Sequence, residues 1–101
     1  MAVQRRPIEF RGGSLSDLRA FPAVARRRAG YQLDRLQLGL EPDDWKSMSD
    51  IGAGVRVIYV AKFQEAIYVL HCFKKKTAKT SKADIALARQ RYDIVLKEHR
   101  S

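Results

Sequence analysis

Residues 55–74 constrain the fold of this chain more than any other stretch. They read VRVIYVAKF, then the polar pair Gln64-Glu65, then AIYVLHCFK. Both apolar runs are rich in β-branched and aromatic residues and have the length of ordinary strands. We therefore predict a β-hairpin over these residues, although Gln64-Glu65 is not one of the dipeptides that fix a turn type.

Side chains alternate between the two faces of a strand, which assigns every hairpin residue to a face. The remaining residues of the first strand, including Arg56, fall on the second face. Its first face carries Val55, Val57, Tyr59, Ala61 and Phe63. In the second strand, strict alternation groups His71 and Phe73 with Ile67, and Cys72 with Leu70. Both faces are mostly apolar, so we expect both to be covered, as in central strands.

The hairpin ends in a lysine cluster, Lys74–Lys76, within a strongly basic chain. The 101 residues carry a net charge of +9, and residues 71–101 hold nine basic and three acidic side chains. This asymmetry favours a polyanionic partner, nucleic acid first and an anionic membrane surface second. A basic protein without such a partner is the alternative. The run Arg26–Arg28 covers more than one face of its helix, because consecutive residues are about 100° apart. It is either a solvated helix surface or a contact for phosphate.

The remaining pattern predicts a single α+β domain over residues 1–101. We predict a short strand at 7–10, followed by a short helix. Ser14 is the predicted N-cap of that helix, with Asp17 at the capping-box position three residues later. A second helix is predicted from about 22 to 38. A loop follows, from which Trp45 and Met48 are expected to pack on the core. Ser81 and Asp84 predict the start of a last helix, whose apolar positions recur at helical spacing.

The sequence carries no motif for a metal or other cofactor, and no strong catalytic motif. The single cysteine, Cys72, excludes an internal disulfide and sits among apolar residues, so we expect an inert buried thiol. There is no apolar leader and no segment that could span a bilayer. A reducing cytoplasm is the expected location.

The hairpin carries positively charged side chains at fixed positions, which could bind and stabilise a phosphate. Arg56 lies on the first strand, and at least one of Lys74, Lys75 and Lys76 is expected on its side of the sheet. Fixed cations stabilise the extra charge of a phosphorane-like transition state. Because an RNA 2′-hydroxyl can be the nucleophile, such cleavage requires no metal. The alternative is a lysine cluster that only attracts nucleic acid.

The candidates for proton transfer are His71, Tyr59 and Tyr92. His71 has an unperturbed pKa near neutrality but sits between apolar residues, so a hydrogen-bonded core histidine and a catalytic one both remain open. The two tyrosines are candidates for orienting RNA or donating a proton, with core packing as the alternative.

Several segments resemble the phage-related HigB-like toxins of the RelE/ParE superfamily. They are PIEF, LRAFP, AGYQLDRLQLGLEPDDWKSM, IGAGV, RVIYVAKF and above all YVLHCFKKKTAKTSKADIALARQRY, and together they cover nearly the whole chain. The resemblance implies an antiparallel sheet with two N-terminal helices and one C-terminal helix. It also implies a toxin of a type II toxin–antitoxin pair that cuts mRNA on the ribosome, or, as in ParE-like members, inhibits gyrase.

The resemblance also implies roles for individual residues. Arg56 matches an arginine of the superfamily's RNases, Lys74, Lys75 and Lys76 match their basic residues after the next strand, and Tyr92 is a weak match to an aromatic residue near the C-terminal helix. Beside this resemblance, we predict from the residues themselves that Arg56 and Lys75 are catalytic and that His71 or Tyr59 assists proton transfer. The predicted RNA contacts are Lys74, Lys76, Lys79, Lys82, Arg91 and Tyr92. The implied partners are the ribosome with its mRNA and an antitoxin of the helix-turn-helix type, with no membrane.

The chain departs from this family between Gly54 and Arg56. Members carry a further strand and turn there, whereas here Gly54-Val55 runs almost directly into Arg56. We therefore expect the sheet to lose a member beside the hairpin. The loss would expose an edge for pairing with another chain, including a second copy, and would reduce or abolish toxicity. A non-catalytic derivative that binds nucleic acid or antitoxin is the alternative function.

Overall fold

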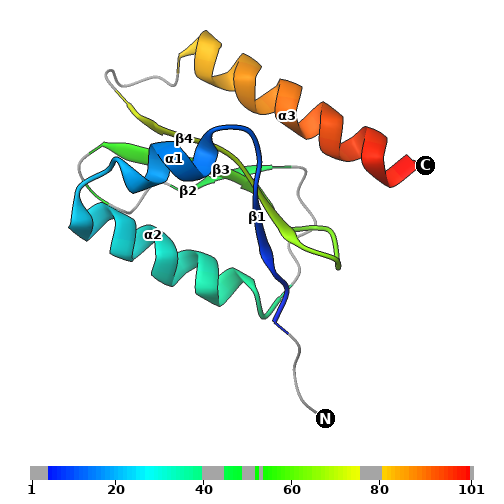
Figure 1. Cartoon of the computed structure of the whole chain (residues 1–101), viewed down its shortest axis with the longest axis horizontal. Coiled ribbons are helices and arrows are strands. Elements are labelled where there is room, and N and C mark those ends of the chain that lie inside the picture. The colour runs from blue at the N-terminus through cyan, green and yellow to red at the C-terminus, as the bar shows by residue number, and fades with distance from the viewer. Residues whose placement is uncertain (1–4, 40–44, 49–51, 53, 76–80, 101) are drawn as a thin grey trace.

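The computed structural model describes residues 5–39, 45–48, 52, 54–75 and 81–100. It forms three layers, with a sheet between two N-terminal helices on one side and one C-terminal helix on the other (Figure 1). The elements in chain order are β1 (Ile8–Phe10), α1 (Ser14–Arg19), α2 (Ala23–Leu36), β2 (Lys46–Met48), β3 (Val55–Val60), β4 (Ile67–Lys74) and α3 (Lys82–Arg100).

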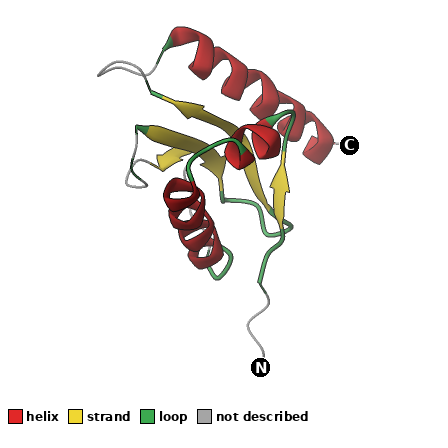
Figure 2. Ribbon diagram, turned by 60° about the vertical axis from the view of Figure 1, so that its left-hand side comes forward, coloured by secondary structure: helices red, strands yellow, loops and turns green. Residues whose placement is uncertain are grey.

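The sheet has the strand order β1-β4-β3-β2 (Figure 2). Strands β3 and β4 are antiparallel neighbours at its centre, which confirms the predicted hairpin. The predicted α+β class and its three helices are confirmed as well. The sheet itself is mixed, because β1 pairs with β4 in the parallel direction, with Ile8 opposite Ile67.

Each face of the hairpin is buried against helices, as its apolar composition predicted. On one face, Leu18 of α1 and Ala29 and Leu33 of α2 pack against the strands. On the other face, α3 contributes buried residues that include Ala88 and Val95. The hairpin is therefore the core of the domain on both sides, and functional groups can reach solvent only where its strands end.

A β-bulge in β4 changes which side chains share a face. Ile58 pairs with His71 whereas Tyr59 pairs with Val69, so Leu70 is an extra residue in β4. An inserted residue reverses the alternation beyond it. Cys72 consequently packs in the α1/α2 core, and Phe73 packs in the α3 core with Leu70. The predicted faces of His71, Cys72 and Phe73 were wrong for this reason, as was that of Lys74, which was expected on the face of Leu70 and lies opposite Val55. Phe63, expected on the face of Val55, follows the end of β3 and packs in the α3 core.

The bulge is held by an arginine from the helix above it. The Arg91 guanidinium of α3 donates to the main-chain carbonyl of Leu70 at 2.8 Å. The same guanidinium lies against Gly12, in the turn between β1 and α1, whose φ is +54°. A Cβ at Gly12 would stand 2.5 Å from Nε of Arg91. The positive φ favours glycine at this position, and a Cβ there would force the Arg91 guanidinium to move.

We expect Gly12→Ala to lower the free energy of unfolding by about 2 kcal/mol or more, because it strains the backbone and displaces Arg91 from Leu70. Gly13→Ala is the matched control, since a Cβ there meets nothing within 4 Å. Gly13→Ala raises the free energy of unfolding slightly because it restricts the unfolded chain, and lowers it slightly because alanine is a poorer N-cap residue for α1. These two small effects oppose each other. Urea denaturation measures both, and equal effects of the two substitutions would contradict the role given to Arg91.

The predicted helix caps had different outcomes. Ser81 caps α3, because its Oγ accepts the main-chain N–H of Asp84 at 3.1 Å. Ser14 does not cap α1: Gly13 is the N-cap residue, with no side-chain cap. The buried Ser14 hydroxyl instead donates to the carbonyl of Val69 in β4, at 3.2 Å. The prediction failed at Ser14 because a strand carbonyl takes its hydroxyl.

The sequence analysis predicted that a strand beside the hairpin is lost and that its edge is exposed. In the structure, a short strand, β2, pairs with β3 at that edge. Lys46 pairs with Tyr59 and Met48 with Val57, in the antiparallel direction. Met48 is buried in the α1/α2 core, as predicted, and Trp45 packs on the α3 side. The segment predicted as a loop therefore supplies a three-residue strand, and the edge of β3 is covered along Val57–Tyr59.

Candidate nucleic-acid interface at the hairpin end

The candidate interface lies where β3 begins, β4 ends and α3 begins. The main-chain N–H of Lys75 donates to the carbonyl of Gly54 at 2.7 Å, which closes the open end of the hairpin. Gly54 has a φ of +70°. This conformation favours glycine, and Gly54 stands directly before β3, in which Arg56 lies. We call this region the hairpin end.

The register of the hairpin brings Arg56 and one lysine to the same face. Phe73 lies opposite Arg56 across the ladder, and Lys74 lies opposite Val55. Alternation then assigns Lys75, two residues after Phe73, to the face of Arg56 and leaves Lys74 on the other. The sequence predicted that at least one lysine of the cluster shares the side of Arg56, and for Lys75, which follows the end of β4, this stays a prediction. Lys76 and Lys79 lie outside the described residues.

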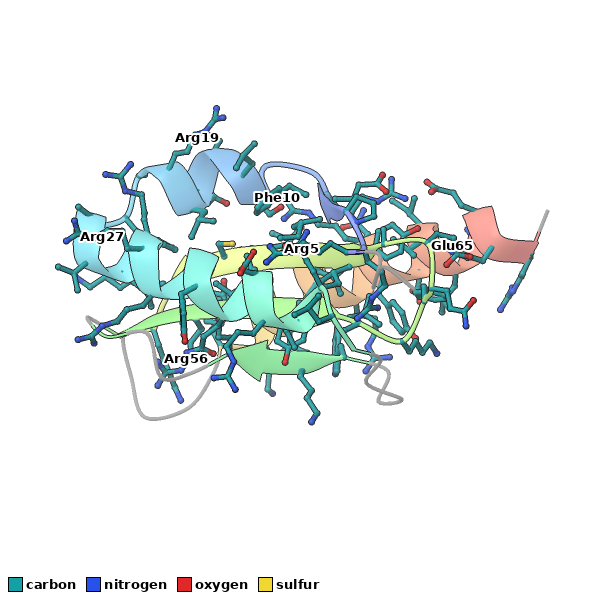
Figure 3. The ribbon with its side chains drawn as sticks, turned by 90° about the horizontal axis from the view of Figure 1, so that it is seen from below. Arg5, Phe10, Arg19, Arg27, Arg56 and Glu65 are labelled. Carbon is teal, nitrogen blue, oxygen red and sulfur yellow. The ribbon has the colours of Figure 1, made fainter. Side chains whose placement is uncertain are left out.

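Further positive charge surrounds the hairpin end. Lys74 and Lys82, the first residue of α3, are exposed. From the other layer, the guanidinium of Arg28 lies beside Gly52, before β3. Figure 3 shows Arg27 and Arg56 toward the same end of the molecule. Cations from α2, β3, β4 and α3 therefore converge on one end, as a surface that binds a phosphate backbone requires.

His71 reaches the same face as Arg56 only because of the bulge. Its Nε2 lies 2.7 Å from Oδ1 of Asp84 in the first turn of α3, and its ring stacks on Phe73 at 4.9 Å between centroids. Asp84 also accepts a hydrogen bond from Ser81. Nδ1 of His71 is buried and finds no hydrogen-bond partner among the described residues. Of the two interpretations left open for His71, this geometry favours the structural one.

We expect Asp84→Ala to lower the free energy of unfolding by about 2 kcal/mol, because it leaves the buried Nε2 of His71 without its partner. Asp93→Ala is the matched control, since Asp93 is exposed on the same helix, and it should change the stability by less than about 0.5 kcal/mol. Urea denaturation gives both values. If the two variants unfold alike, the His71–Asp84 contact does not anchor α3.

The other predicted candidates lie away from the hairpin end. Tyr59 is buried in the α1/α2 core, on the opposite face from Arg56. Tyr92 is buried in the α3 core, near Trp45, with ring centroids 6.2 Å apart. Arg91 holds the bulge carbonyl. The structure therefore gives His71 the same face of the ladder as Arg56, whereas Tyr59 lies in the opposite core, Tyr92 in the α3 core and Arg91 at the bulge.

Cys72 is buried in the α1/α2 core. Burial raises the pKa of its thiol to about 12, with the Asp17 carboxylate adding to the rise. The thiolate, which is the reactive form of a cysteine, is therefore suppressed at neutral pH. This agrees with the predicted inert thiol.

Two contacts at this site were missed by the sequence analysis. Asp84 was identified only as a helix-start residue, and its contact with His71 depends on the bulge. Phe73 was placed on the wrong face for the same reason, so its stacking on His71 was not foreseen. Among the described residues, no group of three potential metal ligands lies together, and no helix is long and apolar enough to cross a membrane.

Comparison with known proteins gives a family for the chain. No curated protein and no solved structure matches it. One family model matches residues 16–93, which include the whole hairpin, the hairpin end and most of α3. By this match, the chain belongs to the family described as Phage derived protein Gp49-like (DUF891).

Proposed function

We propose that this protein is the toxin of a type II toxin–antitoxin pair and cuts mRNA on the translating ribosome. The observation that carries the proposal is the placement of Arg56 and Lys75 on one face of the hairpin end, among exposed basic residues from three other segments. The phage-derived family and the resemblance to HigB-like toxins support the same function. The proposed partners are ribosome-bound mRNA and a helix-turn-helix antitoxin, in the cytoplasm.

In this proposal, Arg56 and Lys75 hold the scissile phosphate, while Lys74, Lys82 and the remaining lysines guide the RNA backbone. The neighbouring 2′-hydroxyl attacks the phosphorus and loses its proton to water, while the bond from phosphorus to the 5′-oxygen of the next nucleotide breaks and that oxygen takes a proton from water. The products are a 2′,3′-cyclic phosphate and a free 5′-hydroxyl, and the cations stabilise the charge that develops on the phosphate oxygens. Arginine suits this role because its planar guanidinium forms two parallel hydrogen bonds to a phosphate. His71 enters proton transfer only if its contact with Asp84 opens.

A second candidate function is a non-catalytic derivative that binds RNA or the antitoxin. The arrangement of the proton-transfer candidates favours it, since Nε2 of His71 contacts Asp84, Nδ1 is buried and Tyr59 lies in the opposite core. The hairpin end would then bind a phosphate backbone without cleaving it. Such binding would weaken steeply as salt rises, because it releases counterions.

Expression of the protein without an antitoxin separates these functions. The toxin is expected to arrest growth and to leave cleaved mRNA on ribosomes. If the chain neither arrests growth nor cuts mRNA, the enzymatic proposal fails, and salt-sensitive RNA binding without cleavage supports the derivative. Growth arrest with intact mRNA and inhibited DNA supercoiling would instead indicate a gyrase inhibitor.

A further inference from the structure

The outer face of α2 exposes three large apolar side chains in a line. Val24 is 51% exposed, Tyr31 66% and Leu38, just beyond the end of the helix, 53%. Among the described residues only one other large apolar side chain is classed as exposed, Ile94 of α3 on the far side of the sheet. Apolar exposure is therefore concentrated on α2.

The spacing of these residues makes a row, here called the stripe, in which Val24 and Tyr31 lie on one side of α2 with Arg27 and Arg28 between them, and Leu38 follows in the turn after the helix. They follow one another at intervals of seven residues, which is close to two helical turns, so they stand one above the other on the same side. The buried residues of α2, Ala25, Ala29 and Leu33, face the sheet on the opposite side. The stripe is thus turned away from the core and extends over roughly 20 Å at 1.5 Å per residue.

The borders of the stripe are basic. Arg28 and Arg35 flank it on one side and Arg27 on the other, at helical positions next to Val24 and Tyr31. The carboxylate of Asp34 is paired with Arg5. A partner segment laid along the stripe would therefore meet apolar surface at its centre and guanidinium groups along its edges.

The stripe leads into a hollow. Leu38 lines a cavity of about 640 Å³, together with Arg5, Arg6, Pro7, Gln37, Gly39, Gln64 and Glu65. Apart from Leu38 and Pro7 its lining is mostly polar or charged, so it offers polar contacts at the end of the stripe. The end of a docked segment would be held there.

We propose that the outer face of α2 binds an amphipathic helix of a partner protein, with aliphatic side chains at seven-residue spacing and aspartate or glutamate on either side of them. Helix-in-groove recognition uses this arrangement. A second copy of this chain is a poor occupant, because two such faces would bring Arg27, Arg28 and Arg35 against each other. The surface excludes Arg56 and Lys75 but shares Arg27 and Arg28 with the surroundings of the hairpin end. Because its test measures peptide binding and not RNA cleavage, this inference and the proposed function can fail separately.

The test uses the full chain and three fluorescent helical peptides of four heptads. The first carries leucine at seven-residue spacing with flanking glutamates, the second has serine for leucine, and the third has lysine for glutamate. We expect the first to bind at least about tenfold more tightly than either of the others. Tyr31→Ala should weaken its binding about tenfold, whereas Ile94→Ala, the matched exposed residue on α3, should not.

Several results would overturn the inference. Equal binding of the leucine and serine peptides would show attraction by net charge alone. Equal losses in Tyr31→Ala and Ile94→Ala would remove α2 as the site. A dimer of the free protein that Tyr31→Ala dissociates would make a second copy the occupant. Circular dichroism of Tyr31→Ala, which places a better helix former at an exposed position, checks that the variant is folded.

Discussion

Arg56→Ala is expected to slow the cleavage of ribosome-bound mRNA by about 100-fold or more, the loss typical when a fixed group that stabilises transition-state charge is removed. Arg56 is partly buried in β3, and its guanidinium donates to the adjacent Val55 carbonyl at 3.0 Å. It is thereby held at the hairpin end rather than extended freely into solvent. Cleavage would be measured on purified ribosomes programmed with one mRNA, at fixed salt.

Two further variants make this expectation specific. Arg56→Lys keeps the charge but not the planar pair of donors, so its rate should fall between those of the wild type and Arg56→Ala. Arg19→Ala removes an exposed arginine of α1, which Figure 3 shows on the opposite margin of the molecule, and should cleave at the wild-type rate. If Arg19→Ala loses as much activity as Arg56→Ala, total charge rather than a site governs the reaction.

The hairpin could be predicted because its signal is local. Two apolar runs of β-branched and aromatic residues around a polar pair have few other folds available. The bulge at Leu70 could not be predicted, because nothing in the alternation of residues 66–74 marks an inserted residue. It is stabilised by Arg91, which lies twenty-one residues further along the chain and donates to the carbonyl of Leu70.

The two serines at the starts of α1 and α3 also show that local sequence does not determine a side chain's hydrogen bond. Ser14 and Ser81 each precede an aspartate by three residues, so the local pattern is identical. Ser81 caps its helix, whereas the hydroxyl of Ser14 lies beside β4 and donates to Val69. Local sequence predicts that a helix starts near such a serine, but the tertiary environment decides where the hydroxyl donates.

The candidate site also contains one feature that the sequence predicts and one that depends on tertiary structure. The sequence could predict that at least one lysine of the cluster shares a side with Arg56, because a hairpin brings the start of one strand to the end of the next; which lysine it is depends on the bulge. The partner of His71 could not be found, since strict alternation gave the face that His71 shares with Ile67. Only after the bulge reverses the alternation does His71 face Asp84 of α3. The position of the proposed phosphate-binding residues at the hairpin end is thus more predictable here than the contacts of the groups proposed to move a proton.

Arg6→Ala is expected to produce the largest loss of stability, about 3 kcal/mol or more. Arg6 is 8% exposed, and its guanidinium donates to the main-chain carbonyls of Leu36, Ala61 and Phe63 at 2.7, 2.7 and 2.9 Å. These carbonyls belong to the end of α2 and to the chain that leaves β3. Alanine would leave all three without this donor, and each buried polar group without a partner costs about 1–3 kcal/mol.

The neighbouring Arg5 provides a matched control for this prediction. Its side chain is 55% exposed and pairs with Asp34 at the surface, so Arg5→Ala should cost less than about 1 kcal/mol. Arg6→Lys should recover only part of the stability, because one ammonium group cannot reach carbonyls on two segments in the geometry of a guanidinium. Thermal and urea unfolding would measure all three variants. A fully stable Arg6→Lys variant would show that positive charge alone, and not the three-carbonyl geometry, joins α2 to the hairpin.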